Sequence, residues 1–439
     1  MQQGSIIPGS GNPYNGIVQE GSKGYNLGFA KHRFNNLGPR FGIAYDPTGD
    51  GKTAMRAGGG IFYERIRQNV NSFDGLGNPP LAYTPNLYNG NIDNLSPALV
   101  SSGTLFPVGV NTFNKNGKIP TIYSWSFDIQ RQLSTTTAID VGYVGNQVNH
   151  LSYASDLDQL PLGTTTSGTA FASVNSQGNA LRPYRGFANI DYTDFAANSN
   201  YNALQIQLTR RFSDNLTISA NYTWSRAMDQ ADDDTSGIPY TYDRRREYAA
   251  AGFDREHTFT ANYVYQLPRL EHRNALIKHT IGGWEVTGIT RFWTGFPLTI
   301  TSPNTNTGTL DGGARVDYVP GAPLTPSNQG WQQFFNPYAF TGAADGTLGS
   351  TGRSILRGPG INQWDISVFK NFHFTENIQF QLRFETFNTF NHTQFAGINT
   401  AIYPANPGQT VTPSTVGTSG QVNSTRDPRT IQLGAKFYF

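Results

Sequence analysis

The sequence ends on the stretch RTIQLGAKFYF, residues 429–439, in which apolar and polar side chains alternate up to the last residue. Successive side chains of a β-strand point to opposite faces, so this alternation predicts a strand with one apolar and one polar face. The apolar face carries Ile431, Leu433, Ala435, Phe437 and Phe439. The last residues of soluble domains usually fray into solvent, whereas this pattern predicts a strand that is held in place to its end.

The same alternation recurs along the chain and predicts about eleven strands. It is clearest in YNALQIQLTRRF (201–212), LTISANYTWS (216–225), WDISVFKNF (364–372) and ENIQFQLRFE (376–385). Weaker versions lie at 40–45, 53–65, 123–133, 138–145, 257–267 and 284–293. Strands of about ten residues exceed the usual five or six of globular sheets, but they match the length needed to cross a bilayer at a tilt.

The connections between these strands alternate between short and long. The short ones are 46–52, 134–137, 213–215 and 375–377, and the long ones, rich in Gly, Asn, Pro, Thr and Ser, are 67–118, 152–198, 226–255, 296–358 and 396–427. The 266–283 link falls where a short connection is due and is the exception in length. This alternation is typical of an antiparallel up-and-down transmembrane β-barrel in an outer membrane. We therefore expect an all-β barrel whose strands face lipid on one side and a wet lumen on the other.

The phase of the strands assigns candidate residues to each surface. The predicted lumen-facing residues are Gln205, Gln207, Arg211, Asn221, Gln379, Gln381, Arg383 and Glu385. Aromatic residues at strand ends are typical of interfacial girdles, and the candidates here are Phe212, Trp224, Trp284 and Phe372. The lipid-facing phase also carries Arg131, Arg210 and Lys370. These cations lie near the ends predicted to face the periplasm, where a cation costs about 0–1 kcal/mol instead of about 2–4 kcal/mol at mid-bilayer.

The composition excludes several other classes of protein. The 439 residues include no cysteine, which rules out a disulfide scaffold, a zinc–thiolate site and a cysteine nucleophile. A net charge of +2 and 14% charged residues give nucleic-acid binding little support. We find no apolar run of about 18 residues that would form a membrane-spanning helix. A soluble β-sandwich, propeller or lectin-like domain is the alternative, which the long strands and their neutral polar faces disfavour.

Candidate chemistry is sparse, and we expect neither catalytic residues nor a cofactor. The seven histidines have no partners at metal-ligand spacing. Carboxylates cluster in the DQADDDTSG stretch (229–237), so Asp229, Asp232, Asp233 and Asp234 are weak candidates for a calcium site. Such a loop is more often simply solvated. The nearby arginines, Arg244, Arg245 and Arg246, are expected to pair with those aspartates or with lipopolysaccharide phosphates, or to contact the substrate.

Several blocks of the sequence resemble the barrel of Oar-like TonB-dependent receptors. They are FGIAYDPTGDGKTAMRAGGGIFYER (41–65), YSWSFDIQRQL to VGYVGNQVNHL (123–151), SNYNALQIQLTRRFSDNLTISANYTWSRAMD (199–229), FDREHTFTANYVYQLP (253–268), GGWEVTGITRFWTGFPLTI (282–300), LRGPG (356–360) and LRFETFNTFNHTQF (382–395). The resemblance covers residues 38–439, which are expected to form the C-terminal half of such a barrel. Residues 1–37, rich in Gly and Asn, are expected to be an irregular extracellular loop.

The resemblance implies an outer-membrane transporter in which a 22-stranded barrel encloses a plug. An inner-membrane TonB complex would pull on a TonB box to release the plug. The sequence lacks a signal peptide, a TonB box, a plug and the first barrel half, and it therefore reads as a fragment. In the alternative, residues 1–37 supply a twelfth strand and close a small barrel, because closed antiparallel barrels need an even strand number. That barrel would act as a passive porin or as an adhesin through its long loops.

The expected location is the outer membrane of a Gram-negative bacterium, as an integral protein. The expected partners are outer-membrane lipid, lipopolysaccharide, the barrel-assembly machinery and an unidentified solute, together with the TonB complex in the full-length protein. The last strand resembles the signal that this assembly machinery reads, with Phe437 and Phe439 as its aromatic residues.

Overall fold

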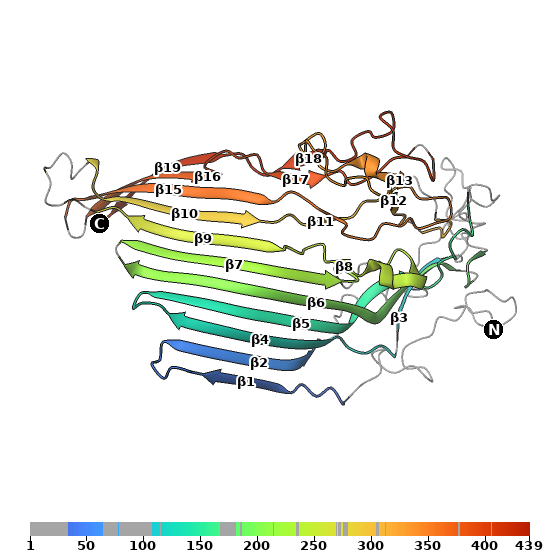
Figure 1. The fold of residues 1–439 in the computed structure, drawn as a ribbon, viewed down its shortest axis with the longest axis horizontal. Helices are drawn as coiled ribbons and strands as arrows, with labels where there is room; N and C mark the ends of the chain where they lie inside the picture. Colours follow the sequence, from blue (N-terminus) through green and yellow to red (C-terminus); the bar gives the residue numbers. More distant parts are fainter. Residues whose placement is uncertain are drawn as a thin grey trace, which may run out of the picture.

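The computed structural model describes residues 34–64, 78, 108–114, 116–166, 181–184, 187–213, 215–233, 237–268, 270, 274, 280–303, 307–311, 313–375, 378–404 and 406–439. Its main feature is a curved antiparallel sheet in which strands follow one another in sequence order, β1-β2-β4-β5-β6-β7-β9-β10-β15-β16-β19 (Figure 1). This order confirms the predicted all-β, antiparallel, up-and-down architecture. Of the expected N-terminal loop, residues 1–33 lie outside the described residues, and residues 34–39 precede the first strand.

Eleven strands form the main path of the sheet, and each corresponds to one strand predicted from the alternation. Their bounds are β1 (Arg40–Tyr45), β2 (Thr53–Tyr63), β4 (Thr121–Gln132), β5 (Thr137–Asp156), β6 (Phe187–Ser213), β7 (Leu216–Asp229), β9 (His257–Gln266), β10 (Trp284–Trp293), β15 (Ile361–His373), β16 (Gln379–Phe387) and β19 (Thr430–Tyr438). All ten pairings between neighbours on this path are antiparallel.

Shorter elements decorate the end of the sheet that carries the long connections. In the sheet itself, β3 (Val108–Phe113) pairs in parallel with β6, and β8 (Ala249–Ala250) pairs with β7. Three two-stranded sheets lie in the connections: β11 (Pro297–Leu298) with β14 (Leu356–Arg357), β12 (Val316–Tyr318) with β13 (Phe340–Gly342), and β17 (Phe395–Ile398) with β18 (Val422–Thr425). Two short 3-10 helices are η3 (Thr241–Glu247) and η4 (Pro337–Ala339). In the described part of the chain, no helix has the length and apolar character to span a membrane.

Short turns lie at one end of the sheet and long connections at the other, and the 266–283 link joins β9 to β10 at the turn end (Figure 1). The turn between β1 and β2 shows how local chemistry makes a tight reversal. The carboxylate of Asp46 accepts hydrogen bonds from the backbone N–H groups of Gly49 (2.9 Å) and Gly51 (2.8 Å). Both glycines have positive φ, at 65° and 69°, which a side chain would disfavour.

The β5–β6 pair is longer than the sequence predicted. Alternation indicated strands at 138–145 and 201–212, with a loop from 152 to 198, whereas β5 has 20 residues and β6 has 27. The register shifts between Asn149 and Leu151, and His150 between them has a positive φ of 65°. This bulge reverses the side-chain phase, so the outer part of the ribbon does not continue the period-two pattern that marks the inner part.

The strand register joins the apolar sides of the eleven strands into a single face. Residues directly opposite each other in an antiparallel pair have side chains on the same face. Phe127 of β4, for example, is opposite Ala57 of β2 and Tyr143 of β5. The same face continues through Leu204, opposite Tyr143 and Trp224, and reaches the last strand where Leu433 is opposite Phe384.

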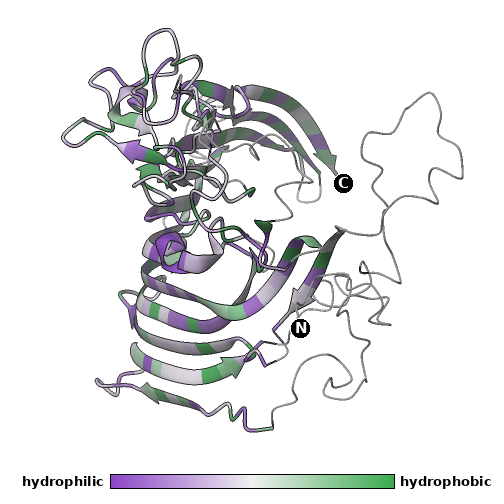
Figure 2. Cartoon of the chain, turned by 90° about the vertical axis from the view of Figure 1, so that its right-hand side faces the viewer, coloured by the Kyte–Doolittle hydropathy of each residue, from purple (hydrophilic) through white to green (hydrophobic). Residues whose placement is uncertain are grey.

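The described residues leave this apolar face uncovered. Large side chains on it are exposed, including Phe41 (73%), Phe127 (42%), Trp224 (54%), Phe384 (45%) and Leu433 (76%). A soluble β-domain would bury such a face in a core, and an apolar surface of this extent marks contact with another protein or a membrane. Seen end-on, the sheet is an arc that is open on one side (Figure 2).

The arc ends at β1 and β19, and in the described part of the chain each of these edge strands pairs on one side only. The long connections, in contrast, fold on themselves. Ile300, Val316, Phe340 and Ile402 have no exposed surface and form a small core that joins residues 296–358 to 395–425. The long loops therefore make a structured layer at their end of the sheet.

Candidate functional site

The predicted lumen-facing residues all belong to the polar phase of the sheet, but they form two separate groups. Gln205 and Gln207 of β6 are exposed, and Asn221 of β7 is directly opposite Gln207. Arg211 lies exposed at the turn end of β6. The other four residues lie on β16. Four strand spacings of about 4.8 Å, or roughly 19 Å along the sheet, separate β7 from β16.

The β16 group forms a connected network of polar side chains. The Nε2 groups of Gln379 and Gln381 both donate to Oδ1 of Asn371, at 3.0 and 2.8 Å. Arg383 donates to Gln381 Oε1 at 2.6 Å, and its guanidinium lies 4.9 Å from the ring centre of Phe369. Glu385 is half-buried opposite Ser367 and Gln432. These contacts hold the side chains in place on the polar face.

The polar face also carries charged pairs that the sequence analysis missed. Arg56 of β2 lies 3.2 Å from the Asp128 carboxylate and donates to Gln130 at 3.1 Å. Arg291 of β10 lies 3.2 Å from Asp365 of β15. Both arginines occupy the polar phase of strands whose alternation is weak. For Arg291, the phase of the better-patterned neighbour β15 would have identified it.

The three cations on the apolar phase lie near the turn end of the sheet. Arg131 hydrogen-bonds the Thr53 hydroxyl and lies 3.8 Å from Asp50 of the β1–β2 turn. Arg210 is opposite Thr137, the first residue of β5. Lys370 is only 5% exposed and donates to the carbonyl of Gly282 in the link before β10.

Aromatic residues on the apolar face form two belts. The turn-end belt contains Trp284 and Phe372, and the ring of Phe372 lies 6.1 Å from that of Phe380. The loop-end belt includes Trp224, stacked 6.4 Å from His257, and the series Phe259, Phe292 and Trp364, with ring centres 5.9 and 5.5 Å apart. The predicted residue Phe212 belongs to β6, but its side chain is outside the described residues.

The separation of the belts can be measured along two strands. Trp284 and Phe292 on β10, and Trp364 and Phe372 on β15, are each eight residues apart. At ~3.3 Å per residue, eight residues span about 26 Å along the strand, which is about 20 Å along the membrane normal at a strand tilt of roughly 40°, somewhat less than the ~25 Å apolar band of outer-membrane barrels. At the turn end, Phe437 is opposite Phe380 and its ring lies 6.2 Å from that of Phe439.

The acidic stretch 229–237 is paired with an arginine that the sequence did not indicate. Arg353 contacts the carboxylate of Asp229 and lies 3.1 Å from that of Asp232. Asp234 lies outside the described residues. Among the described residues, no group of three or more acidic or histidine side chains could hold a metal ion. Asp229 and Asp232 pair with Arg353, and not with Arg244, Arg245 or Arg246 as expected from the sequence. Arg246 instead donates to the carbonyl of Gly349 at 2.5 Å.

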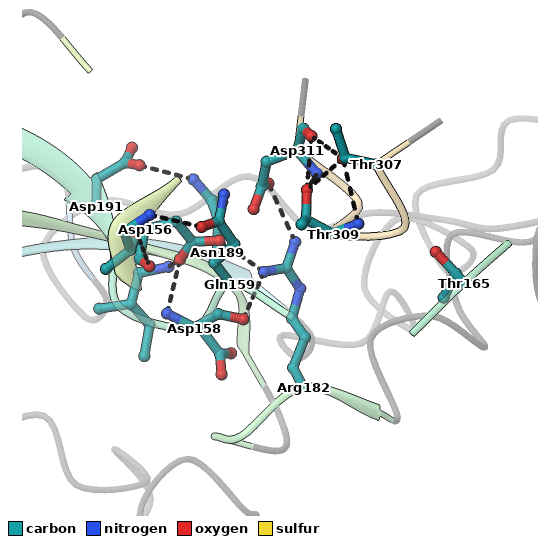
Figure 3. A network of polar contacts seen from close by, with 12 residues as sticks. Asp156, Asp158, Gln159, Thr165, Arg182, Asn189, Asp191, Thr307, Thr309 and Asp311 are labelled. Carbon is teal, nitrogen blue, oxygen red and sulfur yellow. Dashed lines mark hydrogen bonds and ion pairs between the residues drawn. The ribbon is translucent and has the colours of Figure 1, made fainter. Parts of the chain in front are cut away.

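A second buried network joins three of the long loops (Figure 3). Arg182 donates to the carboxylate of Asp156 at 2.7 Å and to the carbonyl of Asp158 at 2.8 Å, and it lies 3.6 Å from the carboxylate of Asp311. Gln159 accepts from the backbone N–H of Thr241 at 2.8 Å. Burial raises the pKa of Asp158 to about 7 and that of Asp311 to about 6, because desolvation disfavours the ionised carboxylates.

An open pocket of about 1070 Å³ lies at the loop end of the last strands. It is lined by the segment 356–362, which leads into β15, by the turn 390–395 after β16, and by Thr325, Gln329, Phe334 and Phe335. Four of its lining residues are phenylalanines, and none is acidic. The alternation pattern did not indicate this pocket, since its walls come from two separate connections, one between β10 and β15 and the other between β16 and β19.

The family model described as "Outer membrane beta barrel domain" matches residues 2–432. The chain belongs to this family. No curated protein matches it in sequence. Among solved structures it is similar to the outer membrane transporter YddB from Escherichia coli, with a TM-score of 0.50, 9% identity, and coverage of 91% of this chain and 40% of YddB.

Two further solved structures are similar at lower scores. The ferric-catecholate import receptor Fiu from E. coli K12 has a TM-score of 0.38 and 13% identity, and the similarity covers 91% of this chain and 34% of Fiu. The ferric citrate transporter FecA has a TM-score of 0.41 and 12% identity, with coverage of 91% and 38%. This chain therefore spans less than half the length of these transporters.

Membership in this family indicates where the chain is located and what each face of its sheet contacts. It is an integral protein of the outer membrane of a Gram-negative bacterium. Membrane barrels present apolar side chains to lipid and polar side chains to the interior. The uncovered apolar face with its two aromatic belts has the character of the lipid-facing side.

Proposed function

We propose that this chain is the C-terminal half of a plug-gated, TonB-dependent transporter barrel of the Oar-like type. The observation that carries the proposal is an eleven-stranded arc with a continuous apolar face and two edges that pair on one side only. Edge strands in lipid leave backbone N–H and C=O groups without partners, at a cost of several kcal/mol for each group. Such an arc requires complementary strands to complete it.

The directions of the two edge strands indicate which kind of additional segment could close the barrel. Ten antiparallel pairings in succession make β1 and β19 run in the same direction, as their arrows in Figure 1 do. A second copy in the same membrane orientation would place its β1 parallel to β19 at the joint. Antiparallel closure instead needs a segment with an odd number of strands whose end strands run the opposite way. An N-terminal half of eleven strands meets this requirement and makes the total even.

In this proposal the polar face lines the lumen through which the solute moves. Gln205, Gln207 and Asn221 on one side, and the β16 network on the other, would line different sectors of that lumen. The TonB complex of the inner membrane would supply the energy through the missing plug segment. The solute is unidentified. No side-chain arrangement in the described residues suggests enzymatic chemistry.

A passive porin-like or adhesive barrel is the second candidate. The observation in its favour is the folded layer of long loops, with its own apolar core and buried ion pairs between Arg315 and Glu247 and between Arg182 and Asp156. An ordered outer surface suits adhesion as well as solute capture. This candidate requires a closed small barrel, with an additional strand from residues 1–37, of which residues 1–33 lie outside the described residues.

The size of the native protein separates the two candidates. An antibody against residues 429–439 would be used on denatured outer membranes of the source cells. The transporter proposal predicts a band of at least twice the 48.2 kDa of this chain, and the gene would encode a plug and further strands upstream. A native band at 48 kDa, preceded only by a signal peptide in the gene, would support the small barrel and contradict the transporter.

A further inference from the structure

The pocket at the loop end of β15 and β16 has features of a binding site that the transport proposal does not use. Its walls converge from residues 356–362, 390–395 and 325–335, and its volume of about 1070 Å³ is at the upper end of the range for small-ligand sites. The buried layer of loop residues lies behind it, since Phe335 is a member of that core. A rigid wall of this kind favours a preformed site.

An exposed aromatic ring is held at the mouth of the pocket. Phe390 is 65% exposed, and its ring packs edge-on against Trp364 at 5.7 Å. Trp364 in turn contacts Phe292 at 5.5 Å. The loop-end aromatic belt therefore leads directly to the pocket. Phe390 is fixed from behind by the belt while its surface stays open to a ligand.

Amide side chains set the geometry of the 390–395 turn, which also carries Phe390. Gln394 is 4% exposed, accepts from the backbone N–H of Asn362 at 3.0 Å and also donates to the Asn362 carbonyl. The amide of Asn388 holds both backbone groups of His392, each at 3.0 Å. Nδ1 of His392 lies 3.0 Å from Gln394 Nε2. When Nδ1 accepts this bond, Nε2 carries the ring hydrogen and is a donor on an exposed side chain.

The charges of the residues that line the pocket limit the class of ligand that it can bind. Its one arginine, Arg357, is already paired with the carboxylate of Asp254, and the lining contains no acidic residue. Three amides line the pocket, and each is partly engaged: Oδ1 of Asn362 accepts from Trp364, Oδ1 of Asn391 accepts from the backbone N–H of Arg429, and Nε2 of Gln329 donates to the Phe334 carbonyl. The Nδ2 groups of the two asparagines and Oε1 of Gln329 can serve a ligand, together with the hydroxyls of Thr325 and Thr393. A site for a free cation would need carboxylates, and a site for a strong anion would need unpaired cations.

We propose that this pocket binds a sugar unit. A pyranose ring presents a C–H face, which complements the negative face of an aromatic ring, and a rim of hydroxyls, which amides read as donors and acceptors. Two sources share this chemistry: a free oligosaccharide and the headgroup of an outer-leaflet glycolipid. The continuity of Phe390 with the lipid-facing aromatic belt is compatible with either source. The site does not depend on how the barrel is completed or energised.

The test is calorimetric titration of the complete barrel protein, purified from outer membranes in detergent micelles. The probes would be maltohexaose and cellohexaose as free sugars, rough-type lipopolysaccharide as the glycolipid, and phosphatidylglycerol as an anionic lipid without sugar. Saturable binding of at least one sugar-bearing probe is expected, and the probe that binds identifies the source. Absence of binding by all three, or equal binding of phosphatidylglycerol, would overturn the proposal.

Three variants test whether the binding occurs in this pocket. Phe390→Ala is expected to weaken affinity about tenfold, because it removes the aromatic platform. Phe374→Ala is the control, since Phe374 is equally exposed (66%) but lies beyond β15 at the turn end. Phe390→Tyr keeps the ring and should retain affinity, which separates loss of the platform from misfolding. Equal weakening by Phe390→Ala and Phe374→Ala would contradict the assignment.

Discussion

The ammonium group of Lys370 lies 5.2 Å from the ring centre of Trp284, on the apolar face of the sheet. The same group lies 5.5 Å from the ring of Phe372 and donates to the carbonyl of Gly282. A cation on a lipid-facing surface is tolerated where its charge reaches a polar group near the interface. Lys370 therefore marks the turn end of the apolar band.

Reversing this charge should destabilise the fold. Lys370→Glu would place a carboxylate against a carbonyl oxygen and the negative faces of two rings, so we expect a loss of about 2–4 kcal/mol in the free energy of unfolding. Denaturant unfolding of the complete barrel protein in micelles, followed by tryptophan fluorescence, measures this loss. Lys436→Glu is the control, because Lys436 is exposed on the polar face and its reversal should change stability by about 0.5 kcal/mol or less. Equal losses in the two variants would count against the interface position of Lys370.

The two faces of the sheet should tolerate a new charge very differently. Phe127→Arg, near the middle of β4, is expected to cost about 2–4 kcal/mol in the membrane-inserted state. Gln205→Arg, on the polar phase of β6, should have little effect because its environment is aqueous. Urea unfolding of the complete barrel protein in lipid vesicles compares the two variants. A larger loss for Gln205→Arg would reverse the assignment of the faces.

Breaking the ion pair at the acidic loop should loosen the long-loop layer. Arg353→Met leaves Asp229, which is 3% exposed, without its charged partner, and we expect a loss of about 3–5 kcal/mol. Adding Asp229→Asn should recover part of that loss, because the orphaned charge is then removed. Arg226→Met, at an exposed position, is the control. A double variant as unstable as Arg353→Met alone would show that the two residues are not coupled.

The Arg182 network predicts a dependence of loop stability on pH. Burial raises the pKa of Asp158 to about 7, with Asp156 also raising it and Arg182 opposing the shift. A raised carboxyl pKa means that the folded state binds the proton more tightly than the unfolded state. Stability is therefore highest below about pH 4, the unfolded pKa, and falls as the pH rises to about 7.

Asp158→Asn isolates this contribution. The variant should unfold at a higher denaturant concentration than the wild type at pH 8, and the difference should shrink at pH 5. Asp311→Asn should show a smaller effect that is complete at lower pH, since burial raises the pKa of Asp311 only to about 6. Equilibrium unfolding at pH 5 and pH 8 measures all three proteins. An identical pH response of Asp158→Asn and wild type would show that Asp158 does not titrate in the network.

The architecture could be predicted from the sequence because a sheet with one face in lipid and the other in water has apolar and polar residues that alternate along every strand. Alternation along β6, β7, β16 and β19 reports lipid on one face and water on the other, and every predicted strand is present. The extension of β5 and β6 was missed because the bulge at His150 shifts the phase. Strand ends that extend beyond the membrane do not have one face in lipid, so apolar and polar residues need not alternate there.

The loop contacts could not be predicted in the same way. Arg353 and Asp229 are 124 positions apart, and Arg182 contacts residues from two connections. No periodicity links such residues, because irregular segments meet through shape and charge rather than through a repeating register. The pocket at 356–362 and 390–395 has the same origin. Composition could indicate that the loops are polar, but not which of their residues pair.

The most direct test of the account is a cysteine scan of β4 in native outer membranes, since the chain itself contains no cysteine. Single cysteines at positions 123 to 130 would be probed with a water-soluble maleimide and, after fluorescent labelling, with a lipid-borne nitroxide quencher. We predict that Ser124, Ser126 and Asp128 positions react with the maleimide, and that Tyr123, Trp125 and Phe127 positions are quenched from the lipid. Reactivity without a two-residue period, or with the opposite phase, would contradict the assignment of one face to lipid and the other to water.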